Sequence, residues 1–376
     1  MLSRTMHSIP VNAPVITAAA KRYVADAMES GWVSSAGSYI DKFEAAFAAY
    51  IGRKHAITTT NGTSALHLAL AGLGVTEGDE VIIPDFTMVA CIDAILYCGA
   101  LPVLCDIEPE TFTIDPRDIE RKITKKTKVI MPVHVYGHPA DMDEILALAK
   151  QHGIAVLEDA AEAHGAKYRG RMCGAMGDAA AFSFYGNKII TTGEGGMVVT
   201  DNDVLAARLR RLKDLAHSPE RRFWHEEIGF NYRMTNLQAA LGLGQLESIA
   251  SFLERKRTMA QRYSAGLQGI AGLRTPITKD DCENVFWMYA IVLDATFPLS
   301  RDAFRAALKD RGIDTRDFFY PLHGMPLAAP FVQQKDQFPV ADDVALRGCY
   351  LPSGLAITDA QIDTVIDAIR TIARSA

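Results

Sequence analysis

The chain has 376 residues, of which 49% are apolar and 22% are charged, a composition that is typical of globular proteins and long enough for two domains. Its net charge of −6 and the lack of a long basic block argue against nucleic-acid binding, and no stretch approaches the roughly 18 apolar residues of a membrane span. Six cysteines without CxxC spacing favour reduced thiols, and the first ten residues lack the apolar core of a signal peptide, so we expect a cytoplasmic protein.

The N-terminal part is predicted to be an extended arm followed by two helices. Two prolines favour an irregular arm over residues 1–16, and Thr17 is expected to cap a helix that ends near Glu29. A loop with two glycines occupies 31–37, and it either connects the helices or lines a pocket. Apolar residues at helical spacing predict the second helix over 39–50.

From residue 55 to residue 200 the pattern alternates between strands and helices. Several of the strands are apolar throughout, as expected where helices cover both faces of a sheet. The predicted strands are His55–Thr59, Glu80–Pro84, Pro102–Asp106, Lys128–His134, Ile154–Asp159, Ala179–Phe184 and Met197–Thr200, and the helices between them are Thr63–Ala71, Met88–Tyr97, Pro116–Ile123 and Asp141–Gln151. This order predicts an α/β fold around a mostly parallel sheet of about seven strands.

After the alternating region, long helices are expected over Asp203–Leu215 and Leu237–Ser264. The chain from about residue 251 onward is predicted to form a smaller α+β domain. The remainder mixes strands near Phe286–Leu293 with shorter helices. We therefore predict a large domain with its N-terminal arm over residues 1–250 and a small domain over residues 251–376.

A lysine follows one of the buried strands. The apolar run 179–184 ends in a turn built from Gly186 and Asn187, and Lys188 comes directly after that turn. A lysine there packs poorly, but it is a good nucleophile if its surroundings lower its pKa. The alternative is an ordinary surface lysine on a hairpin.

The segment Asn61-Gly-Thr-Ser64 joins the first strand to the next helix. A glycine beside hydroxyl residues at a helix N-terminus forms an anion site, because backbone amides and the helix dipole both attract negative charge. Ordinary N-capping is the alternative. The segment is neither a Walker motif nor a dinucleotide fingerprint.

A central strand ends in a carboxylate at Asp159. It can cap the next turn, or it can hold a positive group through a charge-assisted bond of roughly 1.5–3 kcal/mol. Glu158, Asp159 and His164 together suggest metal ligation, but adjacent strand residues point to opposite faces and the spacing matches no recognised ligand set. We therefore expect no metal site.

These three features lie at one rim of the predicted sheet, because ligands of such sheets bind at the carboxyl ends of strands. A phosphate cradle, an anionic partner and an amine match the needs of pyridoxal phosphate (PLP). Its aldehyde needs an amine, its pyridine nitrogen needs a carboxylate, and its phosphate needs amides and hydroxyls.

Ordered motifs extend this pattern along nearly the whole chain: Gly31-Trp-Val-Ser, Phe43-Glu44, Asn61-Gly-Thr-Ser-Ala-Leu66, Gly78-Asp-Glu-Val-Ile-Ile-Pro84, Glu158-Asp-Ala-Ala-Glu162, Phe182-Ser-Phe, Asn187-Lys188, Thr192-Gly-Glu-Gly-Gly196 and Gly229-Phe-Asn-Tyr-Arg-Met-Thr235. With them the chain resembles the sugar-nucleotide aminotransferases of the DegT/StrS type. The resemblance implies the aspartate-aminotransferase fold of fold type I PLP enzymes.

The resemblance also implies roles for individual residues. Lys188 would bind the cofactor aldehyde and later move a proton, and Asp159 would pair with the pyridine nitrogen. Phe86 matches the aromatic residue that covers the ring, and Glu162 would lie near its phenolic oxygen. The implied phosphate ligands are Gly62, Thr63, Ser64 and Ser183, with Asn231 supplied by the neighbouring subunit of a homodimer. Polar loop filling is the alternative for Glu162 and Asn231.

Lys188 favours transamination, because related dehydratases carry histidine at this position. The resemblance then implies L-glutamate as amino donor and a nucleotide-linked keto sugar as acceptor. The 183–197 stretch and the 320–323 segment favour the 4-keto group of GDP-4-keto-6-deoxymannose, with a dTDP- or UDP-linked 3- or 4-keto sugar as the alternative. The predicted substrate contacts are Trp32, Ser34, Tyr185, Tyr320 and His323. Another PLP reaction, or a non-catalytic PLP or nucleotide-sugar binding protein, are the competing hypotheses.

Overall fold

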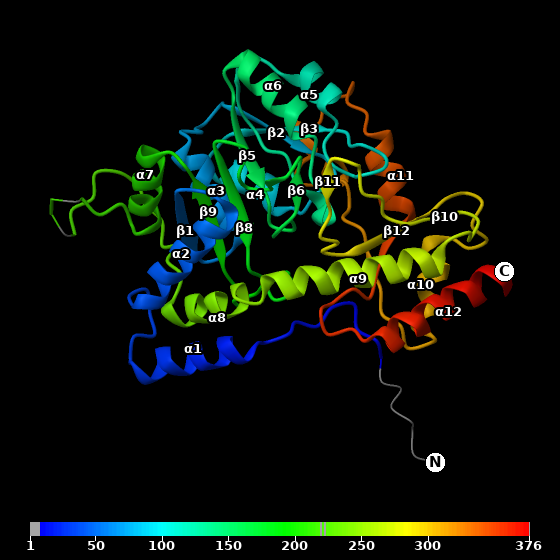
Figure 1. Cartoon of the computed structure of the whole chain (residues 1–376). Coiled ribbons are helices and arrows are strands. Elements are labelled where there is room, and N and C mark those ends of the chain that lie inside the picture. Colours follow the sequence, from blue (N-terminus) through cyan, green and yellow to red (C-terminus); the bar gives the residue numbers. More distant parts are fainter. Residues whose placement is uncertain (1–7, 219, 222, 376) are drawn as a thin grey trace.

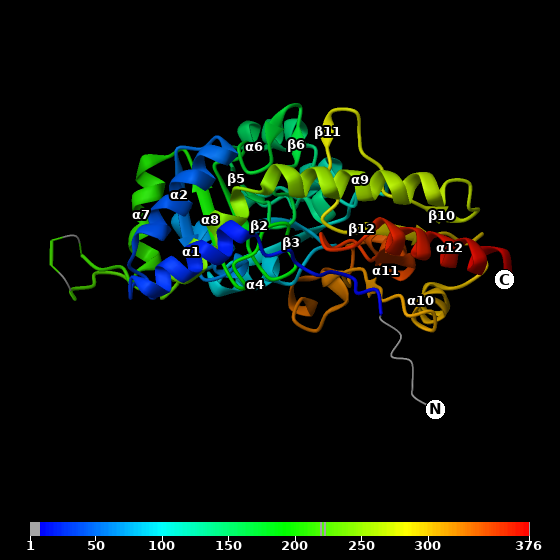
Figure 2. The same cartoon turned by 60° about the horizontal axis from the view of Figure 1, so that its bottom comes forward.

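The computed structural model of the chain describes residues 8–218, 220–221 and 223–375, so the first seven residues of the predicted arm lie outside it. A large α/β body carries a smaller second body at one end (Figures 1 and 2). The main sheet has seven strands in the order β1-β9-β8-β5-β4-β2-β3, and only β9 runs antiparallel to its neighbours. The strands are β1 (His55–Thr59), β2 (Glu80–Pro84), β3 (Leu101–Cys105), β4 (Thr127–Ile130), β5 (Ala155–Asp159), β8 (Ala179–Ser183) and β9 (Gly196–Thr200). The predicted α/β fold with a mostly parallel sheet is confirmed.

The strands of the centre are buried on both faces. All five residues of β8 and all five of β9 are buried, which explains why these segments are apolar without alternation. The predicted strand 128–134 is shorter than expected and ends at Ile130. Pro132 lacks an amide for the ladder, and only its carbonyl pairs, accepting the Asp159 amide at 2.8 Å.

Helices before, between and after the strands cover the sheet (Figure 1). They are α1 (Ala18–Glu29), α2 (Ser38–Ile51), α3 (Gly62–Gly72), α4 (Ala90–Tyr97), α5 (Pro116–Lys122), α6 (Met142–His152) and α7 (Asp203–Lys213). Helix α3 packs against β8 and β9, so its N-terminus lies beside the end of β8.

The single helix predicted over 237–264 is instead two helices, α8 (Asn236–Leu246) and α9 (Ile249–Leu267). Helix α8 packs so closely on α1 that a Cβ at Gly244 would lie 2.3 Å from the Ala20 amide nitrogen. Helix α9 runs instead along α12 (Asp359–Ser375) in the second body. The chain therefore changes direction between the two helices.

The second body has its own antiparallel sheet and its own core. The sheet order is β10-β12-β14-β13, with β10 (Leu273–Arg274), β12 (Tyr289–Leu293), β13 (Arg316–Asp317) and β14 (Gly348–Leu351). Helices α10 (Arg301–Lys309), α11 (Pro339–Arg347) and α12 accompany it. The first half of α9 belongs to the main core and its second half to the core of this body. Helix α9, which begins near the predicted domain boundary, therefore contributes to both cores, and the division into two domains stays a prediction.

The arm 8–16 ties the two bodies together. The Val11 carbonyl accepts the Ser353 amide at 2.9 Å in the small body, and the Val15 carbonyl accepts the Gln245 side chain at 2.9 Å on α8. The remaining elements are β6 (Lys167–Tyr168), β7 (Arg171–Met172), β11 (Cys282–Glu283) and three short 3-10 turns at Val135–Gly137, Leu322–Gly324 and Ala329–Phe331. Within the described ranges, none of the helices combines the length and hydrophobicity that crossing a membrane requires.

Candidate active site

The N-terminus of α3 carries a reciprocal cap. The Asn61 side chain accepts the Ser64 amide at 2.8 Å, and the Ser64 hydroxyl accepts the Asn61 amide at 3.0 Å while donating to its carbonyl at 2.8 Å. The Ser64 hydroxyl is thus committed to the cap. The amides of Gly62 and Thr63 have no hydrogen-bond acceptor among the described residues. They leave the positive end of the helix free to bind an anion.

Ser183 ends β8 directly beside this helix tip. A Cβ on Gly62 would lie 2.8 Å from the Ser183 Cβ and 3.2 Å from its hydroxyl oxygen. Only glycine allows that approach. The structure therefore brings Gly62, Thr63 and Ser183 together, as the sequence predicts.

Glu158 and Asp159, adjacent at the end of β5, serve opposite faces of the sheet. Glu158 is fully buried and accepts the amides of Gly174, Met176 and Gly177, each at 2.7 Å. Asp159 is 5% exposed. The charge of Asp159 opposes the lowering of the Lys188 pKa that burial causes, so Asp159 lies near that amine. In the described part of the chain no cluster suitable for a metal ion is found.

The carboxylate of Asp159 accepts two hydrogen bonds from protein groups. The Cys91 thiol donates to Oδ2 at 3.2 Å, and the Ala161 amide donates to Oδ1 at 3.0 Å. Burial raises the pKa of the Cys91 thiol, and the negative charge of Asp159 raises it further. The sequence does not predict Cys91 as a site residue, because a single cysteine in an apolar segment belongs to no recognised motif.

Lys188 and Glu162 face each other in the same buried region. Lys188 Nζ lies 3.7 Å from Glu162 Oε1, and the two side chains are 11% and 5% exposed. Burial lowers the pKa of the Lys188 amine, while the charges of Glu162 and Asp159 oppose that shift. Burial raises the pKa of Glu162 to about 7. The amine is therefore shielded from bulk water and close to two carboxylates, which is the environment of a reactive lysine.

Tyr136, which sequence reasoning missed, fixes the other oxygen of Glu162. Its amide donates to Glu162 Oε2 at 2.7 Å, and its backbone has a φ of +53°, rare for a tyrosine. Strain of this kind persists where the surroundings impose it, often at functional sites. No sequence pattern signals this conformation.

Trp287, also missed, packs over the lysine. Its ring centroid lies 3.8 Å from Lys188 Nζ, and its indole N–H donates to the Asn187 carbonyl at 2.9 Å. It comes from the small body, about a hundred residues further along the chain. No local motif connects it to Lys188.

Phe86 is fully buried among other aromatic side chains. Its ring is 0% exposed and packs against Phe112, Tyr136, Phe318 and Phe319. Aromatic side chains of the protein therefore surround the Phe86 ring. Its predicted place over the cofactor ring stays a prediction, and the exposed side chain on the same segment is Met88.

His323 fastens the 320–324 segment to the end of β2. Its Nδ1 pairs with buried Asp85 at 2.7 Å, its amide donates to the same carboxylate at 2.7 Å, and its Nε2 lies 3.4 Å from Asp342. Both ring nitrogens thus have carboxylate partners. The predicted substrate contact that stays exposed in this segment is Tyr320.

The other predicted substrate contacts are exposed. Trp32 is 61% and Tyr185 is 51% exposed, and Ser34 lies in the loop with Trp32. Asn236 at the start of α8 shapes that loop, since its side chain donates to the Trp32 carbonyl at 2.7 Å. Asn231 is exposed and pairs through its backbone with Asp214.

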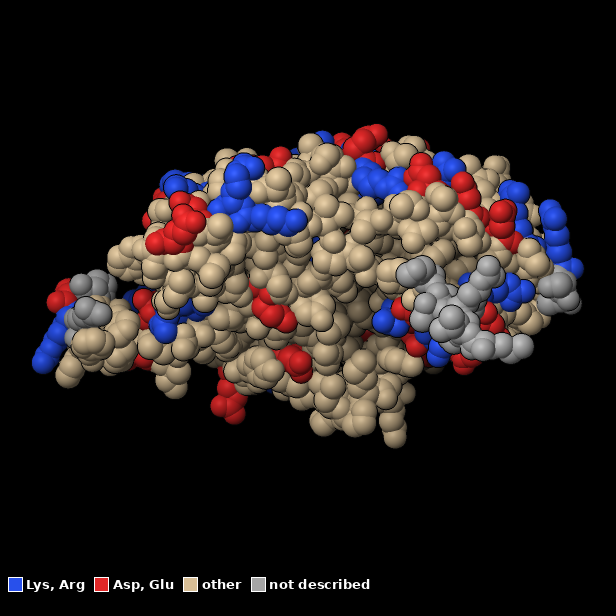
Figure 3. Space-filling view, turned by 90° about the horizontal axis from the view of Figure 1, so that it is seen from below, with Lys and Arg blue, Asp and Glu red and all other residues tan. Residues whose placement is uncertain are grey.

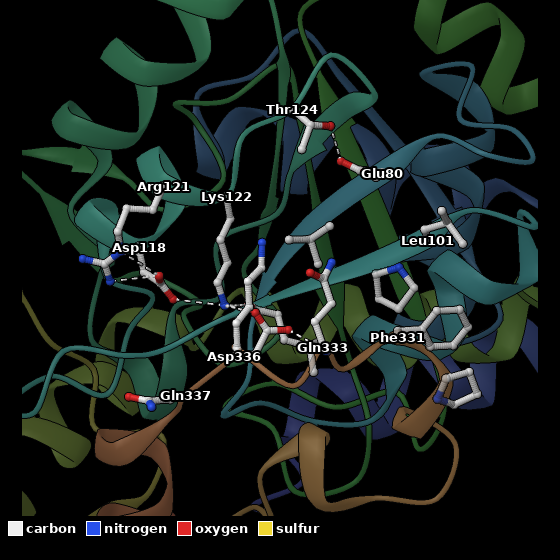
Figure 4. Close-up of a pocket in the computed structure, with 15 residues that line it drawn as sticks. Glu80, Leu101, Asp118, Arg121, Lys122, Thr124, Phe331, Gln333, Asp336 and Gln337 are labelled. Atoms are coloured by element: carbon white, nitrogen blue, oxygen red, sulfur yellow. Dashed lines mark hydrogen bonds and ion pairs between the residues drawn. The ribbon is translucent and has the colours of Figure 1, made fainter.

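A cavity of about 660 Å³ lies elsewhere, along the edge strand β3 (Figure 4). Arg121 and Lys122 of α5 approach it from one side, and Gln333 and Asp336 from the other. None of the predicted site residues lines it. This cavity is therefore separate from the predicted site around Lys188.

The residues of the rim fit PLP. Two free helix amides and Ser183 suit a phosphate, Asp159 suits a pyridine nitrogen, and the shielded Lys188 amine suits an aldehyde. Asn187 Oδ1, beside the lysine, is buried without a hydrogen-bond partner among the described residues, as expected of a group that faces a ligand.

Comparison with known proteins identifies the class. Residues 14–370 match the DegT/DnrJ/EryC1/StrS aminotransferase family, and the chain belongs to this family. It is a PLP-dependent aminotransferase with the fold type I architecture.

Individual relatives cover almost the entire chain. GDP-perosamine synthase of Caulobacter vibrioides is 46% identical over 365 residues, which are 96% of this chain and 97% of the relative. The enzyme of the same name from Escherichia coli O157:H7 is 44% identical and covers 97% and 98%. Among solved structures, Streptomyces venezuelae DesV in complex with a ketimine intermediate matches with a TM-score of 0.91 and 37% identity, covering 98% of this chain and 99% of DesV.

Proposed function

We propose that the chain transfers the amino group of L-glutamate to the 4-keto carbon of GDP-4-keto-6-deoxymannose, forming GDP-perosamine for an O-antigen or related glycan. The observation that carries this choice of substrate is the 42–46% identity, over nearly full length, to relatives named GDP-perosamine synthase. The rim geometry supports the reaction type. The ketone oxygen leaves as water, and glutamate becomes 2-oxoglutarate.

The residues of this chain divide the work. PLP, when bound, supplies the carbonyl that accepts the amino group and the ring that stabilises negative charge. Asp159 would hold the ring nitrogen protonated, and Lys188 would hold the cofactor and carry the proton at the reacting carbon. Glu162 would keep the amine oriented through its charge at 3.7 Å.

The hydrogen bonds of the helix cap support a narrower set of phosphate ligands than the sequence alone implies. We expect the phosphate to meet the amides of Gly62 and Thr63 and the hydroxyls of Thr63 and Ser183. The Ser64 hydroxyl is occupied by Asn61, so we assign Ser64 a supporting role. Removing its hydroxyl would act on the cap first.

We also propose a homodimer whose subunits complete each other's sites through Asn231. A loop that follows α7 projects from the body (Figure 1), and the large apolar side chains Trp224 and Ile228 are 50% and 85% exposed. The face that carries α1 has few charged side chains across its middle (Figure 3), and Met28 in α1 and Trp32 in the loop after it are exposed. Exposed apolar surface of this kind is typical of protein interfaces. Dilution to monomers should release PLP, whereas a monomer that keeps PLP and full activity would contradict this arrangement.

The test is a substrate screen. Purified enzyme with PLP should lose its visible absorbance on adding glutamate, and mass spectrometry should show amination of GDP-4-keto-6-deoxymannose. Amination of a dTDP- or UDP-linked keto sugar instead would replace the proposed substrate and keep the reaction. No response to glutamate would refute glutamate as the donor.

A further inference from the structure

Trp287 contacts Lys188 at two places: at its side-chain nitrogen and at the peptide group that precedes it. Its ring face lies 3.8 Å from the Lys188 nitrogen, well inside the roughly 6 Å range of cation–π attraction. Its N–H donates to the carbonyl of Asn187, the peptide group that enters Lys188, at 2.9 Å. The Trp287 side chain thus contacts both the amine of Lys188 and the backbone next to it.

Trp287 is itself fixed from several sides and is 4% exposed. Its carbonyl accepts a hydrogen bond from the buried Lys256 amine at 2.8 Å, and its ring stacks on Tyr136 with centroids 6.3 Å apart. A Cβ on Gly137 would lie 3.0 Å from the Trp287 amide nitrogen, so glycine lets the two segments dock. A ring that is held this firmly can impose a position on its neighbour.

The Asn187 carbonyl has a second donor from the N-terminal arm. Asn12 Nδ2 donates to it at 3.0 Å. Two donors from segments far apart in the chain therefore fix one peptide plane. Loss of Asn12 would loosen the turn without touching the ring over the amine, which makes Asn12 a matched comparison.

We infer that Trp287 is a positioning residue for Lys188: its N–H orients the turn that carries the lysine, and its ring face holds the amine and favours its protonated form. The charged and titratable groups that face the amine are Glu162, Asp159, Cys91 and His164. To these groups Trp287 adds a neutral, polarised ring face at 3.8 Å from the amine.

This inference rests on the proposed role of Lys188, and the experiment separates the two. Four variants are compared in cofactor-free protein: W287F, which keeps a ring and loses the N–H; W287L, which loses both; N12A; and I291V. Ile291 is buried in β12, two residues past the start of that strand, and its truncation controls for a loosened small body. Thermal denaturation shows which variants fold.

The first measurement is the titration midpoint of the Lys188 amine, from pH-dependent acetylation by limiting acetic anhydride and peptide mass spectrometry. W287L should lower the midpoint by about half a pH unit or more, because the ammonium form loses the ring face. W287F should shift it less, and N12A and I291V should leave it unchanged.

The second measurement is the rate of covalent PLP capture, from the rise in visible absorbance when PLP is added. One lost hydrogen bond to the Asn187 carbonyl should slow capture by roughly fivefold in W287F and N12A, and W287L should be slowest. A W287L protein with the midpoint and capture rate of I291V would overturn the inference. A wild-type protein whose Lys188 never captures PLP would instead refute the proposed role of Lys188.

Discussion

The amines of Lys188 and Lys256 are both shielded from water, and of these two only Lys188 has the surroundings of a nucleophile. Lys256 on α9 is 2% exposed, and its amine donates to the carbonyls of Trp287 and Ser353. Lys188 has its nearest carboxylate oxygen at 3.7 Å, beyond ordinary hydrogen-bond length. Burial lowers the pKa of both amines, that of Lys256 to about 7. A lowered pKa therefore does not distinguish the two lysines, whereas the lack of a short hydrogen bond between the Lys188 amine and any described residue does.

The largest expected effect comes from removing the reactive amine. If Lys188 has its proposed role, Lys188→Ala should reduce turnover by about 10⁴-fold or more, because the cofactor would lose its covalent partner and the reaction its base. Steady-state assays with glutamate and the keto sugar measure this. Comparable turnover in Lys188→Ala and wild type would reverse the assignment of the two lysines.

Asp159→Asn tests the carboxylate that distinguishes the Lys188 region. Turnover should fall roughly tenfold to hundredfold, since a charge-assisted bond to the cofactor ring becomes a neutral one. Glu158→Gln is the matched control. It should lower the melting temperature and affect turnover less, because Glu158 binds only backbone amides and buried groups on the other face. Equal effects on turnover would contradict the division between the two faces.

Much of this site could be predicted from the sequence, because parallel strands place their carboxyl ends at one edge. That rule was enough to gather Asp159, Ser183 and the 61–64 turn. Trp287 and Tyr136 could not be found this way. Trp287 reaches the site through packing of the small body, and Tyr136 acts through a backbone conformation that composition does not reveal.

The pH dependence of stability sharpens the comparison at Glu162. Its pKa is raised by burial from 4.5 to about 7 in the folded protein, so folding favours its protonated form. The stabilising contribution is fully present below about pH 4.5 and is lost as pH rises through 7, with an upper bound of about 3 kcal/mol. In cofactor-free protein, wild type should therefore lose stability relative to Glu162→Gln over this range, as measured by urea denaturation. Parallel stability curves for the two proteins would show that Glu162 titrates normally.

Lys256→Met tests whether the second lysine is only structural. Methionine fills a similar volume but leaves two buried carbonyls without their donor, so unfolding should become easier by about 1–3 kcal/mol. Turnover per folded molecule should change by less than about tenfold, because Trp287 keeps its other contacts and Lys188 is untouched. Denaturation in urea and active-site titration separate the two effects. If Lys256→Met folded stably and lost turnover as completely as Lys188→Ala, then hydrogen bonding to carbonyls would not mark a lysine as structural, and the contrast between the two regions would fail.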